Sequence, residues 1–477
     1  MGMVNRMNDN TSDLLERLRA VVGDAGLVSD QDARASYETD WLKKWTGLSR
    51  VVVRPANAAE TAAVMRICHE TRTPVVTQGG NTGMSGGATP DTSGTQVVLS
   101  TVRMNAIRQV DPLNNTLTAE AGAILANIQV AAQEADRYFP LSLGAEGSCT
   151  IGGNLASNAG GIAVLRYGNA RELVLGLEVV LPDGRIWNGL RGLRKDNTGY
   201  DLRDLFVGSE GTLGVITAAV LKLHARPVAR ATAWVGAQSV DALVQLLAGM
   251  RAACGERLVA FEMISQESLD LILRHVTDVR APLAASHPFN ALIELSDTQE
   301  EGLADLLESS LGDALEAQLI EDVVVSQTHA QTQAFWKIRE GISQAQVRAG
   351  KAVKHDIALP ISAIAAFVDA ADAAVRSVLP DAQIINFGHL GDGNLHYNVL
   401  LPLDAAPDAL AATAARLNRV VHDLVAAANG SISAEHGVGQ LRRDELRHYK
   451  SDVELALMQC IKQSLDPHRI MNPGKLI

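Results

Sequence analysis

Cysteine is scarce in this chain of 477 residues, and the cysteines that occur lie far apart. They form no Cys-x-x-Cys pair, which argues against a disulfide framework, an iron–sulfur cluster and an internal electron relay. We expect them to be reduced packing residues. The four are Cys68, Cys149, Cys254 and Cys460.

Long hydrophobic runs and an excess of positive charge are also absent. No run of about 18 apolar residues occurs, so we expect no membrane span. The formal net charge of −12 disfavours nucleic acid as a partner. The N-terminal residues 1–30 are polar and then amphipathic, unlike a secretory signal. We therefore expect a cytoplasmic protein, and its length predicts two or three domains.

Two short glycine-rich segments in the last quarter of the chain carry three histidines and a glutamate. Residues 388–396 have the sequence GHLGDGNLH and residues 434–439 have the sequence AEHGVG. Imidazole and carboxylate are ligands that suit a divalent ion such as zinc, and three protein ligands leave a position open for catalysis. The pattern predicts a catalytic metal site; the competing interpretation is a solvated turn with scattered histidines.

The seven-residue spacing of His389 and His396 requires a reversal of the chain. A turn over residues 390–393, with glycines supplying positive φ angles, lets the two imidazoles face each other. After this turn the alternation of residues 394–398 predicts a strand with Asn394, His396 and Asn398 on one face.

Three further glycine-rich loops lie in the first half of the chain, at residues 78–87, 143–161 and 206–216. The first follows a predicted helix over 58–71 and a predicted buried strand over 74–77. Glycine-rich backbone can approach a ligand closely and direct its N–H groups at phosphate oxygens. No loop has the nicotinamide fingerprint G-x-G-x-x-G or the P-loop pattern G-x-x-x-x-G-K-[ST]. A large dinucleotide enclosed by several loops fits this pattern best.

These loops, the two histidine segments and the sequence NPGK at residues 472–475 occur in an order that resembles a known family. The chain is similar, from about Arg54 to its end, to the FAD-linked 2-hydroxyacid dehydrogenases of the vanillyl-alcohol-oxidase or p-cresol-methylhydroxylase (PCMH) type. Within that family it most resembles the D-2-hydroxyglutarate dehydrogenases, with D-lactate dehydrogenases and the flavin subunit of glycolate oxidase as neighbours.

The resemblance implies an α+β protein. A PCMH-type FAD-binding domain of two subdomains is expected at 1–226, an inserted α+β substrate domain at 227–430, and a C-terminal segment that returns to the flavin at 431–477. Family members with covalent flavin carry a histidine in the first glycine loop, which is absent here, so FAD is expected to be noncovalent. The FAD-binding residues implied are Gln78, Gly79, Gly80, Asn81, Thr82, Gly83, Ser85, Gly144, Gly147, Ser148, Gly152, Gly153, Asn154, Ser157, Asn158, Gly161, Glu210, Gly211, Gly214, Ile216 and Asn472.

The resemblance also implies roles around the metal. His389, His396 and Glu435 match the metal ligands of the family, and zinc is the expected ion, although manganese, cobalt or iron would also suit the set. His436 matches the general base that takes the substrate's hydroxyl proton; a fourth metal ligand is the alternative. Asn398 matches a substrate-contacting position.

A second anion site would select a dicarboxylate over lactate. Arg339 and Ser343 are four residues apart in a predicted helix, where a guanidinium and a hydroxyl can converge on a carboxylate. Lys354, at the start of a predicted alternating strand, matches the third member of this cluster. The family has Thr where this chain has Ser343, and often Tyr where it has His355. The competing interpretation is that Arg339 pairs with a protein acid such as Glu340.

The resulting prediction is oxidation of D-2-hydroxyglutarate to 2-oxoglutarate by hydride transfer to flavin N5. Alternatives within the family are D-lactate, D-malate and glycolate. A zinc hydrolase would leave the glycine loops unexplained, and a flavin-retaining binding protein would leave the metal ligands unexplained. The reduced flavin must pass its electrons to an external acceptor such as electron-transfer flavoprotein or a quinone. A homodimer is compatible with the family.

Overall fold

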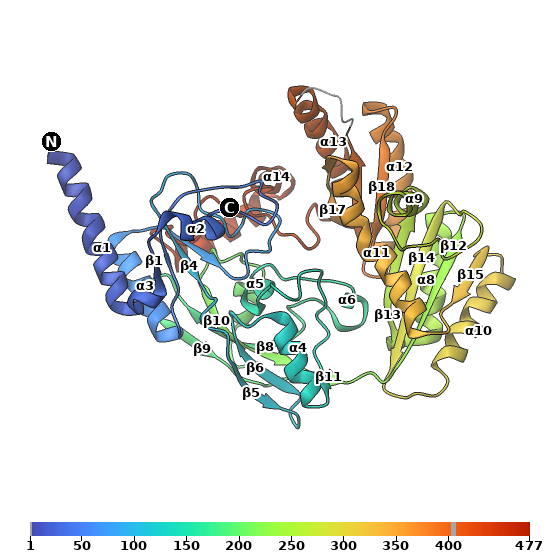
Figure 1. The fold of residues 1–477 in the computed structure, drawn as a ribbon, viewed down its shortest axis with the longest axis horizontal. Helices are drawn as coiled ribbons and strands as arrows, with labels where there is room; N and C mark the ends of the chain where they lie inside the picture. Colours follow the sequence, from blue (N-terminus) through green and yellow to red (C-terminus); the bar gives the residue numbers. More distant parts are fainter. Residues whose placement is uncertain (1, 402–406) are drawn as a thin grey trace. The chain divides into compact units, whose positions relative to one another are not determined.

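The computed structural model describes residues 2–401 and 407–477, which form two compact units (Figure 1). The first unit comprises residues 1–161, 168–226 and 435–477, and the second comprises residues 162–167 and 227–434. The first unit is therefore discontinuous in sequence, and its last segment begins at Glu435. The predicted domain boundaries after residues 226 and 430 remain a proposal for how the chain divides into folding domains.

The first unit contains two main sheets. One has the order β1-β2-β4-β3, in which β2, β4 and β3 are parallel and β1 is antiparallel. The other is antiparallel with the order β5-β6-β10-β8-β9. The strands are β1 (Leu27–Val28), β2 (Ser49–Val53), β3 (Val75–Gln78), β4 (Gln96–Ser100), β5 (Ile107–Asp111), β6 (Thr116–Glu120), β8 (Val174–Val180), β9 (Ile186–Gly189) and β10 (Val215–Lys222), with β7 (Arg137–Tyr138) and β11 (His224–Ala225) pairing separately.

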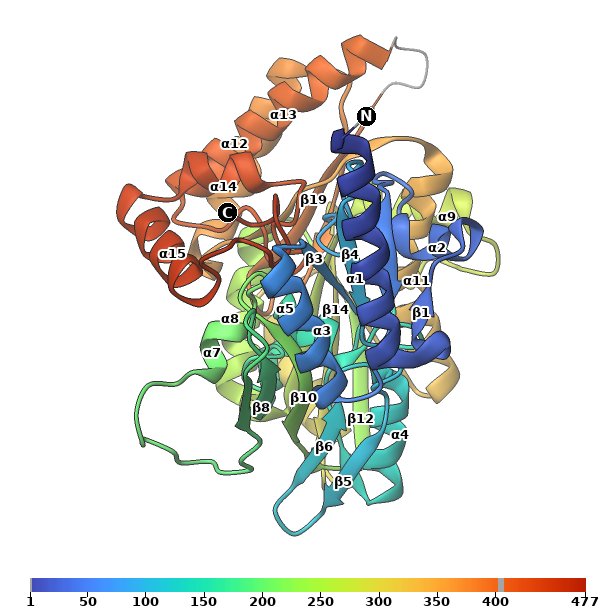
Figure 2. The same ribbon diagram turned by 90° about the vertical axis from the view of Figure 1, so that its left-hand side faces the viewer.

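The helices of the first unit cover these sheets. Their bounds are α1 (Gly2–Gly26), α2 (Gln31–Glu38), α3 (Ala58–Thr71), α4 (Leu125–Glu134), α5 (Ile151–Ala156), α7 (Arg203–Phe206), α14 (Arg443–Tyr449) and α15 (Asp452–Leu465). Helix α3 and strand β3 confirm the predicted helix and strand. Asn57 caps α3 by accepting from Glu60 N–H. Apolar residues of α1 and α3 share one core with the first sheet, and the two helices lie side by side (Figure 2).

The second unit is built on one eight-stranded antiparallel sheet. The strand order is β15-β12-β14-β13-β18-β19-β16, and β17 also pairs with β19. The strands are β12 (Ala229–Ala237), β13 (Leu258–Ser265), β14 (Phe289–Asp297), β15 (Asp322–Val325), β16 (Ala352–Val353), β17 (Asp356–Ala358), β18 (Gln383–Gly388) and β19 (Asn394–Leu400).

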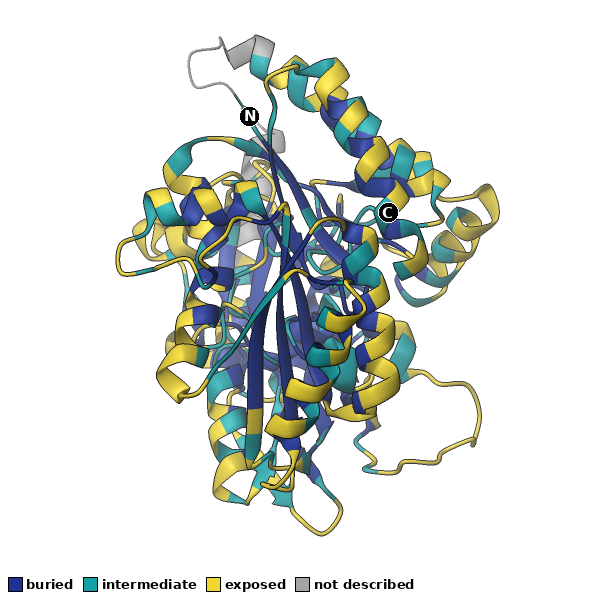
Figure 3. Ribbon diagram, turned by 90° about the vertical axis from the view of Figure 1, so that its right-hand side faces the viewer, coloured by how far each residue is buried: buried dark blue, intermediate teal, exposed yellow. Residues whose placement is uncertain are grey.

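Both faces of this sheet are covered by helices. One face packs with α8 (Val240–Cys254), α10 (Leu303–Glu316), α12 (Ile364–Val378) and α13 (Pro407–Ala427), and the other packs with α9 (Gln266–His275) and α11 (His329–Ala349). The remaining elements are α6 (Val164–Tyr167), η1 (Gly255–Arg257) and η2 (Ile361–Ala363). The strands are buried while the helices expose their outer faces (Figure 3). Burial on both faces accounts for apolar strands without polar alternation.

Two sequence expectations need correction. All four cysteines are free, but Cys460 is exposed on α15 and is not a packing residue. The strand expected to start at Lys354 is interrupted, because β16 ends at Val353 and β17 begins at Asp356. The side-chain carbonyl of Asn398 accepts from His355 N–H at 3.1 Å, which holds the interrupted segment against β19. Among the described residues, no helix is both long enough and apolar enough to cross a bilayer.

Candidate active site

The glycine-rich loops of the first unit line one pocket. The predicted FAD-binding residues that line it are Gln78, Gly79, Gly80, Asn81, Thr82, Gly83, Ser85, Gly152, Gly153, Asn154, Ser157, Glu210, Gly211, Gly214 and Ile216. Sequence reasoning missed several small residues in the lining, which are Thr77, Gly87, Ala88, Thr101, Cys149, Thr150, Ala156, Ser209 and Val215. His436, predicted as the base, also lines this pocket.

Close approach of the loops explains why glycine is required at particular positions. A Cβ at Gly80 would clash with the carbonyl oxygen of Ser148. Gly211 has a φ of +69°, and a Cβ there would clash with the hydroxyl of Thr77 at the end of β3. The loops therefore pack so closely at these positions that only glycine fits.

The pocket's polar lining fits a large polar cofactor. Thr150 Oγ1 and Asn154 Oδ1 are buried and, within the described part of the chain, have no hydrogen-bond partner. Buried polar atoms without partners are costly, so the folded loops call for a bound molecule that satisfies them. The residues present thus fit FAD.

Six predicted FAD-binding residues lie outside the pocket lining: Gly144, Gly147, Ser148, Asn158, Gly161 and Asn472. Some of them support the loops instead. The amide of Asn472 donates to the carbonyls of Gly87 and Glu210 at 2.9 and 2.8 Å. Asn158 Oδ1 accepts from the N–H of Arg171 at 3.0 Å.

Glu210 holds the segment that carries His436. Its two carboxylate oxygens accept from the N–H groups of Val438 and Gly439, both at 2.7 Å. Ser85 Oγ donates to the carbonyl of His436 at 3.0 Å. Burial raises the pKa of Glu210, opposed by the two backbone hydrogen bonds. Glu210 lines the pocket as predicted, but its carboxylate is engaged with the 437–439 turn.

The hairpin between β18 and β19 brings the two predicted imidazole ligands together. Phe387 is paired with His396, and the turn is closed by hydrogen bonds from Gly393 N–H and Asn394 N–H to the carbonyl of His389. The rings of His389 and His396 have centroids 5.6 Å apart. The reversal predicted from the glycines is therefore present.

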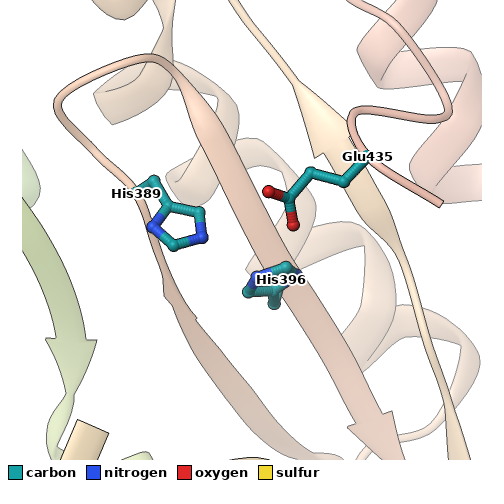
Figure 4. A group of neighbouring side chains, drawn as sticks. All are labelled: His389, His396 and Glu435. Carbon is teal, nitrogen blue, oxygen red and sulfur yellow. The ribbon is translucent and has the colours of Figure 1, made fainter. Parts of the chain in front are cut away.

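Glu435 follows directly after the second unit's last residue, Ala434, whose N–H donates to the carbonyl of Asp356. Possible ligand atoms of His389, His396 and Glu435 all lie within 4.8 Å of one another, and their side chains point toward a common centre (Figure 4). Two imidazoles and a carboxylate fit a divalent metal with an open coordination position. Glu435 Oε1 also accepts from Gly161 N–H at 2.6 Å.

Sequence reasoning missed Glu262, a buried acid in the middle of β13. It accepts hydrogen bonds from His389 Nδ1 and from Arg339 Nε, both at 2.6 Å. Burial opposes its ionisation, but Arg339 and His389 lower the pKa of Glu262 to about 2. A single carboxylate in the otherwise uncharged run 258–265 was a signal available from the sequence.

The predicted substrate residues are held in different ways. Arg339, on α11, is buried, and its guanidinium stacks over the ring of Phe387 at 4.9 Å. It donates a hydrogen bond to Glu262, so the protein acid with which it pairs is Glu262 and not Glu340. Ser343, one turn later, is exposed. Burial lowers the pKa of Lys354.

Asn398 is engaged at both ends of its amide. Besides accepting from His355, it donates to Gln346 Oε1 at 3.2 Å. Its amide therefore ties β19 to α11 and to the interrupted strand. A substrate contact by Asn398 remains a prediction.

Two family models match the chain. A FAD binding domain matches residues 49–189, and the C-terminal domain of FAD linked oxidases matches residues 226–476. Two solved structures share the fold. The structure of p-cresol methylhydroxylase with bound substrate has 17% identity and a TM-score of 0.76, and the match covers 98% of this chain and 96% of that chain. The structure of 4-ethylphenol oxidase from Gulosibacter chungangensis has 15% identity and a TM-score of 0.74, and the match covers 98% of this chain and 97% of that chain. The predicted PCMH-type α+β fold is confirmed.

Curated relatives match along nearly the whole chain. A probable mitochondrial D-2-hydroxyglutarate dehydrogenase from Oryza sativa subsp. indica is 38% identical over 98% of this chain and 82% of that protein. The mitochondrial D-2-hydroxyglutarate dehydrogenase of Bos taurus is 39% identical over 94% of this chain and 81% of that protein. The D-2-hydroxyglutarate dehydrogenase of Xanthomonas citri pv. viticola is 38% identical over 92% of this chain and 92% of that protein.

The names of these relatives contradict one expectation. The rice and bovine proteins are named as mitochondrial, so the inference of a cytoplasmic location from composition alone is wrong. A polar and then amphipathic N-terminal region does not distinguish between compartments inside a cell.

The family assignment agrees with the site. The pocket formed by glycine-rich loops lies largely in the segment matched by the FAD binding domain, and both histidine segments lie in the segment matched by the C-terminal domain. The chain therefore belongs to the FAD-linked oxidase family and is an FAD-dependent D-2-hydroxyacid dehydrogenase.

Proposed function

We propose that the protein oxidises D-2-hydroxyglutarate to 2-oxoglutarate with noncovalent FAD and a divalent metal, zinc being the expected ion. The observation that carries this proposal is the adjacency of Glu435 and His436. Glu435 belongs to the group of possible metal ligands, and the next residue lines the pocket that fits FAD. The names of the relatives support the choice of substrate.

When bound, FAD would take the substrate's α-hydrogen as hydride at N5, and the metal would acidify the substrate's hydroxyl. His389, His396 and Glu435 would hold the metal. His436 accepts the hydroxyl proton as general base. Glu210 and Ser85 hold the His436 segment, which keeps the base in position during proton transfer.

The distal carboxylate of the substrate is assigned to Arg339 and Lys354, with Ser343 nearby on α11. Among the described residues, Arg339 is hydrogen-bonded to Glu262 through Nε, so its outer guanidinium edge can receive a second carboxylate. A dicarboxylate is favoured over D-lactate and glycolate because these substrates have no distal carboxylate to bind Lys354 and the outer edge of Arg339. D-malate, a shorter dicarboxylate, is the second candidate.

The electrons leave through an external acceptor, such as electron-transfer flavoprotein or a quinone. The four free cysteines are dispersed along the chain and provide no relay. A homodimer remains a prediction.

Anaerobic bleaching of the bound flavin tests the function directly. D-2-hydroxyglutarate, L-2-hydroxyglutarate, D-malate, D-lactate and glycolate are added separately, before and after treatment with a chelator. We expect rapid bleaching by D-2-hydroxyglutarate that is lost with chelator and restored by zinc. The L-isomer serves as the control for stereochemistry.

Other outcomes have distinct meanings. Faster bleaching by D-lactate or glycolate would exclude a distal-carboxylate site at Arg339 and Lys354. Bleaching by D-2-hydroxyglutarate that resists complete metal removal would exclude the metal from the reaction. A protein purified without flavin and unable to bind added FAD would contradict the whole proposal.

A further inference from the structure

Glu262 lies where three elements of the second unit meet. Its side chain is 1% exposed and extends from the middle of β13. His389 reaches it from the end of β18, and Arg339 reaches it from α11. Ile264, two residues further along the strand, belongs to the core beneath α9 and α11, so Glu262 faces that same side of the sheet.

The two hydrogen bonds constrain both partners of Glu262. A carboxylate only accepts, so His389 must carry its proton on Nδ1, which leaves the Nε2 lone pair for a metal. Arg339 donates through Nε, and its guanidinium is also stacked over Phe387, two residues before His389. The orientation of the imidazole and that of the guanidinium therefore depend on the same carboxylate.

We propose that Glu262 is a positioning residue that couples the metal site to dicarboxylate selection. It sets the tautomer of His389 and the orientation of Arg339 at once, so its loss weakens metal binding and substrate discrimination together. The inference rests on the proposed function, because it takes His389 as a metal ligand and Arg339 as the cation for the distal carboxylate.

Glu262→Gln is the most informative variant, because the glutamine side chain has nearly the same size as that of glutamate. An amide offers a single acceptor oxygen, so one of the two donors would face an N–H group. Glu294→Gln is the matched control. Glu294 is also a buried strand glutamate, on the adjacent β14; it accepts from Trp336 on the same helix α11 at 2.8 Å and pairs with Arg230 at 3.5 Å.

Two quantities are measured on the FAD-loaded protein. The first is the Kd for zinc, from competition with a chromogenic chelator, which does not depend on activity. The second is the ratio of kcat/KM for D-2-hydroxyglutarate to that for D-lactate. For Glu262→Gln we expect zinc affinity to fall by about 10- to 100-fold and this ratio to fall by at least about tenfold. Glu294→Gln should leave both values close to those of the wild type.

An added Arg339→Met substitution separates the two effects. In that background Glu262→Gln should still weaken zinc binding but should no longer change the substrate ratio. If Glu262→Gln is poorly folded, as judged by FAD content and circular dichroism, Glu262→Asp is used; its shorter side chain draws the carboxylate back from both partners, so zinc affinity and the substrate ratio should both fall.

The inference is overturned if a folded Glu262→Gln protein keeps both the zinc Kd and the substrate ratio within about twofold of the wild type. A loss of one quantity alone would refute the coupling. The proposed function is judged separately, on the wild type: if the wild type binds no zinc or is not bleached by D-2-hydroxyglutarate, that function fails and the coupling fails with it.

Discussion

Buried carboxylates in this protein hold other functional groups in place. Glu210 accepts two backbone N–H groups from the turn that follows His436, and Glu262 accepts from His389 and Arg339. A carboxylate can accept two or more hydrogen bonds from well-separated donors, which few other side chains can do. Each acid therefore fixes groups that lie far from it in the sequence.

Glu210→Gln should lower kcat by about 10- to 100-fold, because a small displacement of His436 suffices for such a loss. The amide would place an N–H group against Val438 or Gly439 N–H. FAD content should stay near that of the wild type, since the glycine loops remain. The measurement is steady-state kinetics with D-2-hydroxyglutarate together with the flavin-to-protein absorbance ratio.

Glu38→Gln is the control for this change. Glu38 is a buried acid of the first unit whose carboxylate accepts two hydrogen bonds from Ser49 on β2. Its substitution should leave kcat unchanged. A Glu210→Gln protein that loses FAD, and whose kcat returns to that of the wild type when FAD is added, would show that Glu210 acts on the cofactor rather than on the base.

Residue identities could be predicted where a motif supplied them, but their partners could not. Glu210 was found from its glycine-rich loop, and His389 and His396 from their hairpin. Glu262 and His389 are 127 positions apart in sequence, and their contact depends on the pairing of β13 with β18. Long-range strand pairing of this kind leaves no local pattern to read.

At the scale of elements, local turn chemistry made the β18–β19 hairpin predictable, whereas the strand expected to start at Lys354 was not correctly predicted. Its alternation predicts one strand, but β16 ends at Val353 and β17 begins at Asp356, and between them His355 N–H donates to the side chain of Asn398. Competition from a side-chain amide with the strand ladder is a tertiary effect.

Helix α15, near the C-terminus, is joined to other segments of the first unit by hydrogen bonds of Lys462. Lys462 Nζ donates to Asp466 Oδ2 at 2.6 Å and to the carbonyls of Thr212 and Met471 at 2.7 and 2.9 Å. Thr212 follows directly after Gly211, which lines the FAD pocket. The buried ammonium thus connects α15 to a loop of the cofactor site.

Lys462→Met should destabilise the first unit by about 3–5 kcal/mol, because it leaves the buried carboxylate of Asp466 without its cation. Urea unfolding, followed by the release of flavin fluorescence, measures the change. Lys450→Met is the matched control, since Lys450 pairs with Glu454 on an exposed surface of the same helix region and should shift the midpoint little. Equal midpoints for the two variants would contradict the assigned role of Lys462.

At the scale of the whole molecule, the chain forms its first unit from segments separated by about two hundred residues of the second unit. Family resemblance predicted this arrangement, whereas composition alone predicted only two or three domains. The chain re-enters the first unit at Glu435, so a possible metal ligand is followed directly in the sequence by His436, which lines the FAD pocket. Short-range patterns cannot reveal such a return, because both segments resemble ordinary glycine-rich loops.

Removal of FAD should affect the two units unequally. The first unit would lose the ligand expected to satisfy buried polar atoms of its loops, whereas the second unit has its own cores on both faces of one sheet. Since a ligand stabilises only the state that binds it, amide hydrogen exchange should increase in residues 78–87, 148–158 and 208–216 of the apoprotein.

Strands β12, β13 and β14 serve as the internal control in this exchange experiment. Their amides should keep the protection they have in the FAD-bound protein, and added FAD should restore slow exchange in the three loops. Increased exchange of similar size in β12–β14 would show that the second unit depends on the flavin for its fold. That result would contradict two independently stabilised units, because a separate core leaves the second sheet's stability independent of a ligand held by the first unit.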